Sequence, residues 1–155
     1  QFKDDYDKNQ PLWKVLPEFV QKNPRYERVG LRDLCRDIHA VYRANDVARL
    51  TTEMYLSDMV PAMRPTDAWS MMAHREIDRV PIDELEGRIT TSLITPYPPG
   101  IPMLLSGENF GDANSPQIGY LRSLQSWDHH FPGFEHETEG TEIIDGVYHV
   151  MCVKA

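Results

Sequence analysis

The chain has 155 residues, of which 41% are hydrophobic, a combination typical of one globular domain of ordinary size. Its 16 basic and 24 acidic side chains give a formal net charge of -8, which argues against nucleic acid and anionic membrane surfaces as partners. Apolar stretches are only a few residues long, and no signal-peptide pattern opens the chain. We therefore expect one cytoplasmic domain.

The two ends of the chain differ in character. Residues 1–10 are polar, carry five charged side chains and begin without methionine, so we interpret them as a linker from a missing upstream domain. In this interpretation residues 11–155 form the domain itself. Residues 150–155 run out of an apparent strand and stop, which we expect of a natural end.

Apolar residues at helical spacing dominate the first half of the chain. The spacing predicts a helix over residues 11–23, kinked or divided at Pro17 because proline cannot continue the hydrogen-bonding pattern. The cleanest amphipathic pattern starts after Gly30 and predicts a helix that ends near Asn45.

Two shorter helical segments follow. Thr66 and Asp67 are typical helix caps, and they precede a short apolar pattern over residues 69–73. Residues 81–85 begin with proline and predict one further helical turn. The first half of the chain is thus predicted to be mostly helical.

The composition changes after Gly87. Residues 89–95 are rich in β-branched side chains and predict a strand, and a second strand is predicted over residues 102–105. Ser115, followed by proline, predicts the start of another helix, which ends near Phe131.

The last segment has the pattern of a β-hairpin. Asp145-Gly146 lies between two strand-like runs, and this dipeptide favours the tight turn that joins antiparallel strands. The predicted fold class is α+β: N-terminal helices followed by a small mixed or antiparallel sheet with a C-terminal β-hairpin.

A proline-rich loop separates the two middle strands. Residues 95–102 contain four prolines, which hold the backbone extended and stiff, and Gly100 can adopt a positive φ. The sequence predicts a defined, rigid loop.

Three histidines near the end of the chain suggest a metal site at first sight. His129 and His130 are adjacent, so their side chains point about 100° apart on a helix, and Pro132 and Gly133 intervene before His136. This spacing is poor for a metal, and we assign no metal ligands. The alternative is packing or hydrogen bonding at a helix end.

No catalytic motif is evident elsewhere. The glycine-bearing segment 106–112 matches neither a phosphate-binding nor a dinucleotide-binding pattern, and no serine has the setting of an activated nucleophile. Cys35 and Cys152 are far apart and are interpreted as buried free thiols. Four acidic residues form an edge that is either a solvated face or a pH-gated subunit contact: Glu135, Glu137, Glu139 and Glu142.

Two strings of residues carry a resemblance to a known family. Pro96-Tyr-Pro-Pro-Gly-Ile-Pro leads to Gly107-Glu108, and Phe131-Pro-Gly-Phe-Glu follows a Trp-Asp-His-His sequence. Together, in this order, they resemble the tail of the bacterial pyridoxal-phosphate-dependent decarboxylases of ornithine, lysine and arginine, the arginine branch most of all. The likeness is weaker over the first 90 residues.

The resemblance implies a C-terminal α+β domain of a larger enzyme of fold type I. Its cofactor, pyridoxal 5'-phosphate, would be bound by an upstream domain, because the Ser-x-His-Lys type of motif of the family is missing here. No catalytic or cofactor-binding residue is therefore assigned in this chain. The implied partners are the upstream domain, neighbouring subunits in a homodimer or ring of dimers, and a basic amino-acid substrate.

Five residues are candidates for an active-site entrance, because the proline loop is stiff enough to form a wall and a carboxylate attracts a guanidinium or ammonium group. They are Tyr97, Pro98, Pro99, Gly100 and Glu108. A structural role for Glu108 within its own loop is the alternative. Two other functions stay open at this point: an independent ligand- or metal-binding module, and a purely structural assembly domain.

Overall fold

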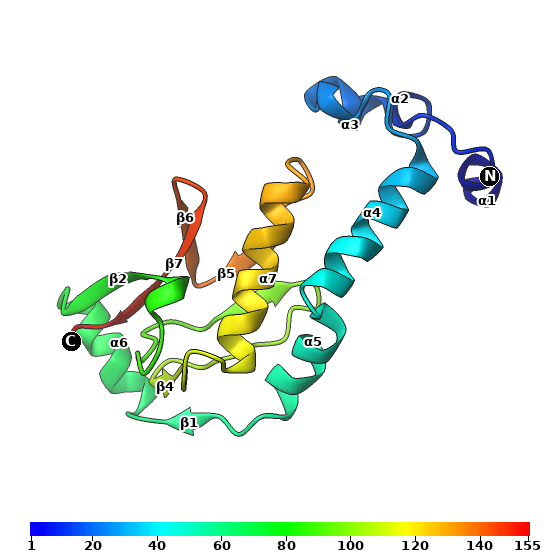
Figure 1. The fold of residues 1–155 in the computed structure, drawn as a ribbon. Coiled ribbons are helices and arrows are strands. Elements are labelled where there is room, and N and C mark those ends of the chain that lie inside the picture. The colour runs from blue at the N-terminus through cyan, green and yellow to red at the C-terminus, as the bar shows by residue number, and fades with distance from the viewer.

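The computed structural model describes residues 1–155, and its helices and small antiparallel sheets form an α+β fold, as the sequence predicts. The helices α1–α3 lie together at one end, and α4 connects them to a larger body that contains α5, α7 and the strands (Figure 1). None of the helices is both long enough and apolar enough to span a lipid bilayer.

The N-terminal segment is a series of short helices: α1 (Phe2–Asp7), α2 (Leu12–Val15), α3 (Pro17–Lys22) and the 3-10 turn η1 (Pro24–Tyr26). The predicted helix over residues 11–23 is divided into two helices at Pro17, as expected. Residues 1–10 contain α1, and the Asn9 side chain accepts hydrogen bonds from the N–H groups of Arg32 and Asp33. Their role as a linker stays a prediction, and so does the domain boundary after residue 10.

The predicted long helix is confirmed as α4 (Leu31–Ala44). The helix α5 (Val47–Leu56) follows it directly after Asp46, which has a left-handed backbone conformation, and the sequence interpretation did not identify this helix. The helix α6 (Pro65–Ala73) begins before the predicted caps, so that Thr66 and Asp67 lie in its first turn. The predicted turn at residues 81–85 is the 3-10 turn η2 (Ile82–Glu84).

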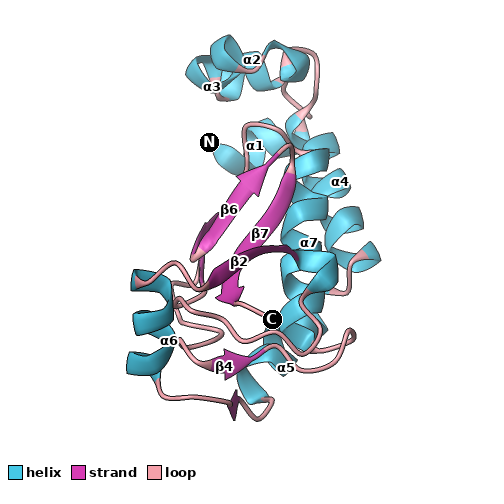
Figure 2. Ribbon diagram, turned by 90° about the vertical axis from the view of Figure 1, so that its left-hand side faces the viewer, coloured by secondary structure: helices cyan, strands magenta, loops and turns pink.

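The largest sheet has three antiparallel strands in the order β2-β7-β6: β2 (Ile77–Pro81), β7 (Val147–Val153) and β6 (Thr141–Ile144). The predicted hairpin is confirmed as β6 and β7, joined by Asp145 and Gly146, which both have positive φ as this type of turn requires. In Figure 2 the sheet lies beside α7. Alternate residues of β7 are buried, which places this strand at the centre of the core.

The strands predicted over residues 89–95 and 102–105 were wrong. Apart from Thr95, which begins a short strand, these segments make only isolated bridges, such as Thr90 to Cys152 and Ile94 to Leu104. Most of their β-branched side chains are nevertheless buried, and β propensity reports mainly that a residue suits a half-buried surface. Two other short pairs form instead: β3 (Thr95–Tyr97) with β5 (Glu137–Glu139), and β1 (Val60–Pro61) with β4 (Glu108–Asn109).

The helix α7 (Pro116–His130) contributes to two hydrophobic clusters. The hydroxyl oxygen of Ser115 caps it by accepting a hydrogen bond from the Ile118 N–H, as the Ser-Pro sequence predicts. Leu121 belongs to the larger cluster, which lies between α5, α7 and the main sheet, whereas Trp127 belongs to a smaller cluster with residues of α2, α3 and α4. Because α7 is shared, it fixes the position of the N-terminal helices relative to the sheet.

Candidate functional site

The proline loop begins where β3 ends. Tyr97, Pro98, Pro99 and Gly100 are all exposed, and the Gly100 N–H donates a hydrogen bond of 2.8 Å to the Pro96 carbonyl. Gly100 has a φ of +76°, a conformation that glycine adopts without strain. Four of the five candidate entrance residues therefore lie together on one exposed turn.

Glu108, the fifth candidate, lies elsewhere. Its side chain is 8% exposed, and its carboxylate accepts a hydrogen bond of 2.7 Å from the Leu105 N–H. It lines neither of the two cavities described below. The observed contact therefore supports the structural alternative for Glu108, in which the carboxylate holds its own loop.

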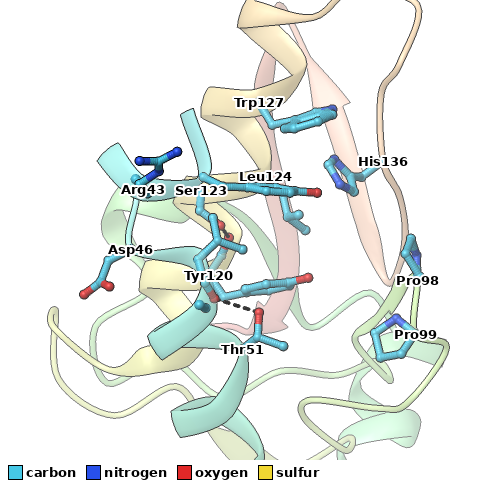
Figure 3. A pocket seen from close by; sticks show the side chains of 13 residues that line it. Arg43, Asp46, Thr51, Pro98, Pro99, Tyr120, Ser123, Leu124, Trp127 and His136 are labelled. Carbon is cyan, nitrogen blue, oxygen red and sulfur yellow. Dashed lines mark hydrogen bonds between the residues drawn. The ribbon is translucent and has the colours of Figure 1, made fainter. Parts of the chain in front are cut away.

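A cavity of about 580 Å³ lies between the helices and the proline loop. Pro98 and Pro99 form one wall of it, and residues of α4, α5 and α7, together with Asp46 and His136, form the rest (Figure 3). Its volume is within the range of small-molecule sites, about 300–1,000 Å³. The proline loop thus borders a cavity large enough for a small molecule.

Aromatic side chains line much of this cavity. The Tyr42 ring stacks on the Trp127 ring with a centroid distance of 4.9 Å, and the Trp127 Nε1–H donates a hydrogen bond of 2.7 Å to the Phe134 carbonyl. Tyr120 is only 5% exposed, and burial raises the pKa of its hydroxyl group. These rings are held by packing before any ligand arrives.

One polar group on the cavity wall belongs to a buried network. His136 lines the cavity, and its Nδ1 lies 3.3 Å from Oδ1 of Asp128. The same carboxylate accepts hydrogen bonds from the His136 backbone N–H and from the Tyr148 hydroxyl. Burial alone would raise the pKa of Asp128, but these hydrogen bonds outweigh it and hold the pKa below its usual value.

A second cavity, of about 510 Å³, is lined by residues of β3, β5 and β6 and is acidic. Tyr97, Glu137 and Glu139 line it, and the Tyr97 hydroxyl donates a hydrogen bond of 3.3 Å to Glu139. The negative charge of Glu139 raises the pKa of Tyr97. The loop therefore borders an aromatic cavity with its prolines and an acidic one with its tyrosine.

The three histidines do not converge on one point. His129 contacts the Gly146 carbonyl, His130 contacts the Ser126 carbonyl, and His136 contacts Asp128. No three side chains of the His, Cys, Asp and Glu types are arranged to hold a metal ion. His129 and His130 lie in the last turn of α7, so hydrogen bonding at a helix end describes these two, whereas His136 lies beyond the helix and contacts Asp128.

The sequence interpretation did not identify the aromatic cavity. Tyr42 and Trp127 lie within two of the predicted helices, but nothing in the local pattern indicated that the two rings would meet. The pairing of His136 with Asp128 was also missed, although only eight positions separate them. Thr51 lies on the unpredicted helix α5, so it gave no usable signal.

Comparison with known proteins gives a consistent result. Residues 48–154 match the sequence model of the family described as Orn/Lys/Arg decarboxylase, C-terminal domain. The chain is 55% identical to the biodegradative arginine decarboxylase of Escherichia coli (strain K12), over 99% of this chain and 20% of that protein. It is 41% identical to the lysine decarboxylase LdcA of Pseudomonas aeruginosa, over 99% of this chain and 21% of that protein.

Solved structures agree with these matches. The structure of lysine decarboxylase A from Pseudomonas aeruginosa superposes with a TM-score of 0.92 at 40% identity, covering 99% of this chain and 21% of that one. The constitutive lysine decarboxylase of E. coli gives a TM-score of 0.89 at 31% identity, covering 99% and 22%. This chain thus spans about a fifth of the length of the relatives that it matches.

Proposed function

Since this chain belongs to the family of Orn/Lys/Arg decarboxylase C-terminal domains, we propose that it is the non-catalytic C-terminal part of a decarboxylase that acts on a basic amino acid. The observation that carries the proposal is the 55% identity with a biodegradative arginine decarboxylase across 99% of this chain. Arginine, converted to agmatine, is the proposed substrate. Lysine, converted to cadaverine, is the alternative.

Pyridoxal 5'-phosphate is the proposed cofactor of the parent enzyme, where it would accept the electrons left when carbon dioxide departs. The residues of this chain do not fit it, because the cofactor needs a lysine in a cavity for covalent attachment. All five lysines are exposed, and none lines either cavity. They are Lys3, Lys8, Lys14, Lys22 and Lys154. The cofactor site therefore belongs to parts of the protein outside this chain, and we expect the isolated chain to be inactive.

The proline loop is proposed as one wall of the entrance to the parent's active site. Two carboxylates, Glu137 and Glu139, line the cavity next to Tyr97. A basic amino acid carries a cationic side chain, and carboxylates near an entrance raise the local concentration of cations. This charge arrangement supports an entrance for arginine or lysine.

Exposed apolar side chains support a second role in packing against the rest of the enzyme. Leu56 is 79% exposed at the end of α5, and Val60 is 56% exposed on β1. Ile101 and Leu105, on the segment after the proline loop, are also exposed. Surfaces of this kind commonly mark contacts between domains or subunits. We therefore propose that these side chains contact the upstream domain and neighbouring subunits in a homodimer or ring of dimers. A cytoplasmic location of the protein stays a prediction.

The decisive experiment for the parent activity is an assay of the full-length protein against arginine, lysine and ornithine. We expect decarboxylation of arginine, dependent on added pyridoxal 5'-phosphate. An independent ligand- or metal-binding module would release no carbon dioxide from any of the three. Deleting residues 11–155, with separate measurement of oligomer size and activity, then distinguishes an entrance role from a purely structural assembly role.

The entrance is tested by removing its charge without changing its shape. The double variant Glu137→Gln and Glu139→Gln is expected to raise KM for the amino acid several-fold and to leave kcat nearly unchanged, with the effect shrinking at high salt. The matched control is Glu84→Gln with Glu86→Gln, two exposed carboxylates outside both cavities. Equal KM values for the two double variants would remove the support for an entrance here.

A further inference from the structure

We propose that the aromatic cavity between α4, α5, α7 and the proline loop binds a small organic cation, an alkylguanidinium or alkylammonium ion. The inference concerns this cavity alone and does not depend on the activity of the parent enzyme. It does fit that activity, because the proposed substrates and products carry such groups. The cavity volume of about 580 Å³ suits a ligand of this size.

His136 uses only one of its two ring nitrogens, Nδ1, in a hydrogen bond within the protein. Asp128 is a carboxylate and can only accept, so the Nδ1 of His136 carries the proton that lies between them. In the neutral ring, Nε2 is then an acceptor, and no protein atom donates to it. Figure 3 shows this ring at the cavity wall, on the same side as Pro98 and Pro99. The cavity thus presents an unused acceptor to a ligand that donates N–H groups.

The aromatic rings that line the cavity have a charge distribution that suits a cation. Aromatic faces are electronegative, so they attract cations and disfavour anions. Tyr42, which is 39% exposed, lines the cavity and stacks one face on Trp127. Tyr120 lines the cavity from α7, and in Figure 3 its ring lies below Trp127. A cation between these rings gains favourable contacts that an anion of the same size would lose.

Two charged side chains also line the cavity. Arg43 and Asp46 are both exposed, and Figure 3 shows them at the side opposite His136. Asp46 forms an ion pair with Arg49, so its charge is already compensated. The buried carboxylate of Asp128 contacts Nδ1 of the His136 ring, so a fixed negative charge lies beside the ring that presents Nε2. A cation bound at Nε2 is attracted by this charge.

The test is equilibrium binding of n-butylguanidinium to the full-length protein, because this probe does not form a Schiff base with an aldehyde cofactor. We expect binding at pH 8. Tyr42→Leu removes one ring and is expected to weaken binding by about 2- to 30-fold, the range of one cation–π contact. His136→Asn retains an N–H donor for Asp128 but removes Nε2, and is expected to weaken binding.

The controls are chosen to match each variant. Tyr55→Leu and His39→Asn change the same residue types outside the cavity, and binding should be unchanged in both. The proposal is overturned if the wild-type protein does not bind the probe, as expected if another part of the protein fills the cavity. It is also overturned if n-pentanol or pentanoate competes equally well for the cavity. Unchanged affinity in both Tyr42→Leu and His136→Asn is the third result that would overturn it. The decarboxylase assay is independent of all three, so failure here leaves the proposed activity to its own test.

Discussion

The hydroxyl group of Tyr148, on β7, donates a hydrogen bond of 2.5 Å to the carboxylate of Asp128, on α7. Both side chains are buried, so this contact joins the central strand of the main sheet to the C-terminal end of the longest helix. Burial raises the pKa of Tyr148 far above its usual value, because it removes water from the hydroxyl group. The hydrogen bond to Asp128 and the negative charge of that carboxylate raise this pKa further. Tyr148 therefore remains a donor at any physiological pH.

Removing this hydroxyl group should loosen the junction between α7 and β7. A hydrogen bond to a charged group contributes roughly 1.5–3 kcal/mol, so Tyr148→Phe is expected to destabilise local structure by about that amount. Hydrogen exchange of the α7 and β7 amides in the full-length protein measures it. Tyr55→Phe, which removes an exposed hydrogen bond to the Ile101 carbonyl, should have a smaller effect. Equal protection in both variants would contradict the role assigned to Tyr148.

Acid should weaken the same junction. The folded-state pKa of Asp128 lies below its unfolded value, so its stabilising effect is complete above the unfolded pKa, about 3.9, and is lost as the pH falls through the folded pKa. We expect exchange protection around His136 and Tyr148 to fall below about pH 4. In Asp128→Asn, this acid-dependent loss should be smaller, although the variant is less stable at pH 7. An identical acid response in the two proteins would assign the loss to other carboxylates.

Glu108 is expected to stabilise its loop rather than to select the substrate. Glu108→Ala leaves the Leu105 N–H without its acceptor, which should cost about 1–3 kcal/mol and increase hydrogen exchange near β4. Glu108→Gln retains an acceptor oxygen, so kcat/KM of the full enzyme should be unchanged. A large fall in kcat/KM for Glu108→Gln, with normal exchange near β4, would instead place this carboxylate in the substrate path.

The two cysteines should differ in reactivity. Cys152 is fully buried on β7, and burial raises the pKa of its thiol to about 12, so almost no thiolate exists at pH 8. Cys35 on α4 is only partly buried. Treatment of the native full-length protein with iodoacetamide, followed by peptide mass spectrometry, should show alkylation of Cys35 and none of Cys152. Both should react after unfolding, and native labelling of Cys152 would show that the main sheet opens.

The elements that were predictable from the sequence are those with local causes. The helix α4 follows from apolar residues at helical spacing, and the hairpin follows from Asp145-Gly146, whose turn geometry is set by neighbouring residues. The strand β2 was not predicted, because its five residues end in proline and pair with a strand far away in the sequence. Burial, rather than sheet pairing, explains the β-branched residues at Thr90 and Thr91.

The candidate sites were predictable only in part, for a related reason. Proline stiffness is local, so the exposed loop from Tyr97 to Gly100 could be identified from its composition. The cavity behind it depends on the packing of α4 against α7, which brings Tyr42 onto Trp127. Glu108 was a reasonable entrance candidate by charge alone, but its burial against Leu105 depends on the tertiary structure.

The position of β7 in the main sheet also bears on how the domain can form during protein synthesis. β7 follows the other strands of this chain in sequence, yet it lies between β2 and β6 and contributes Tyr148, Val150 and Cys152 to the larger core. Until it leaves the ribosome, neither β2 nor β6 has its partner strand, and the core lacks the side chains that β7 contributes. A premature stop codon after Gly146 would therefore leave a nascent chain with exposed core surface, a target for chaperones and proteases.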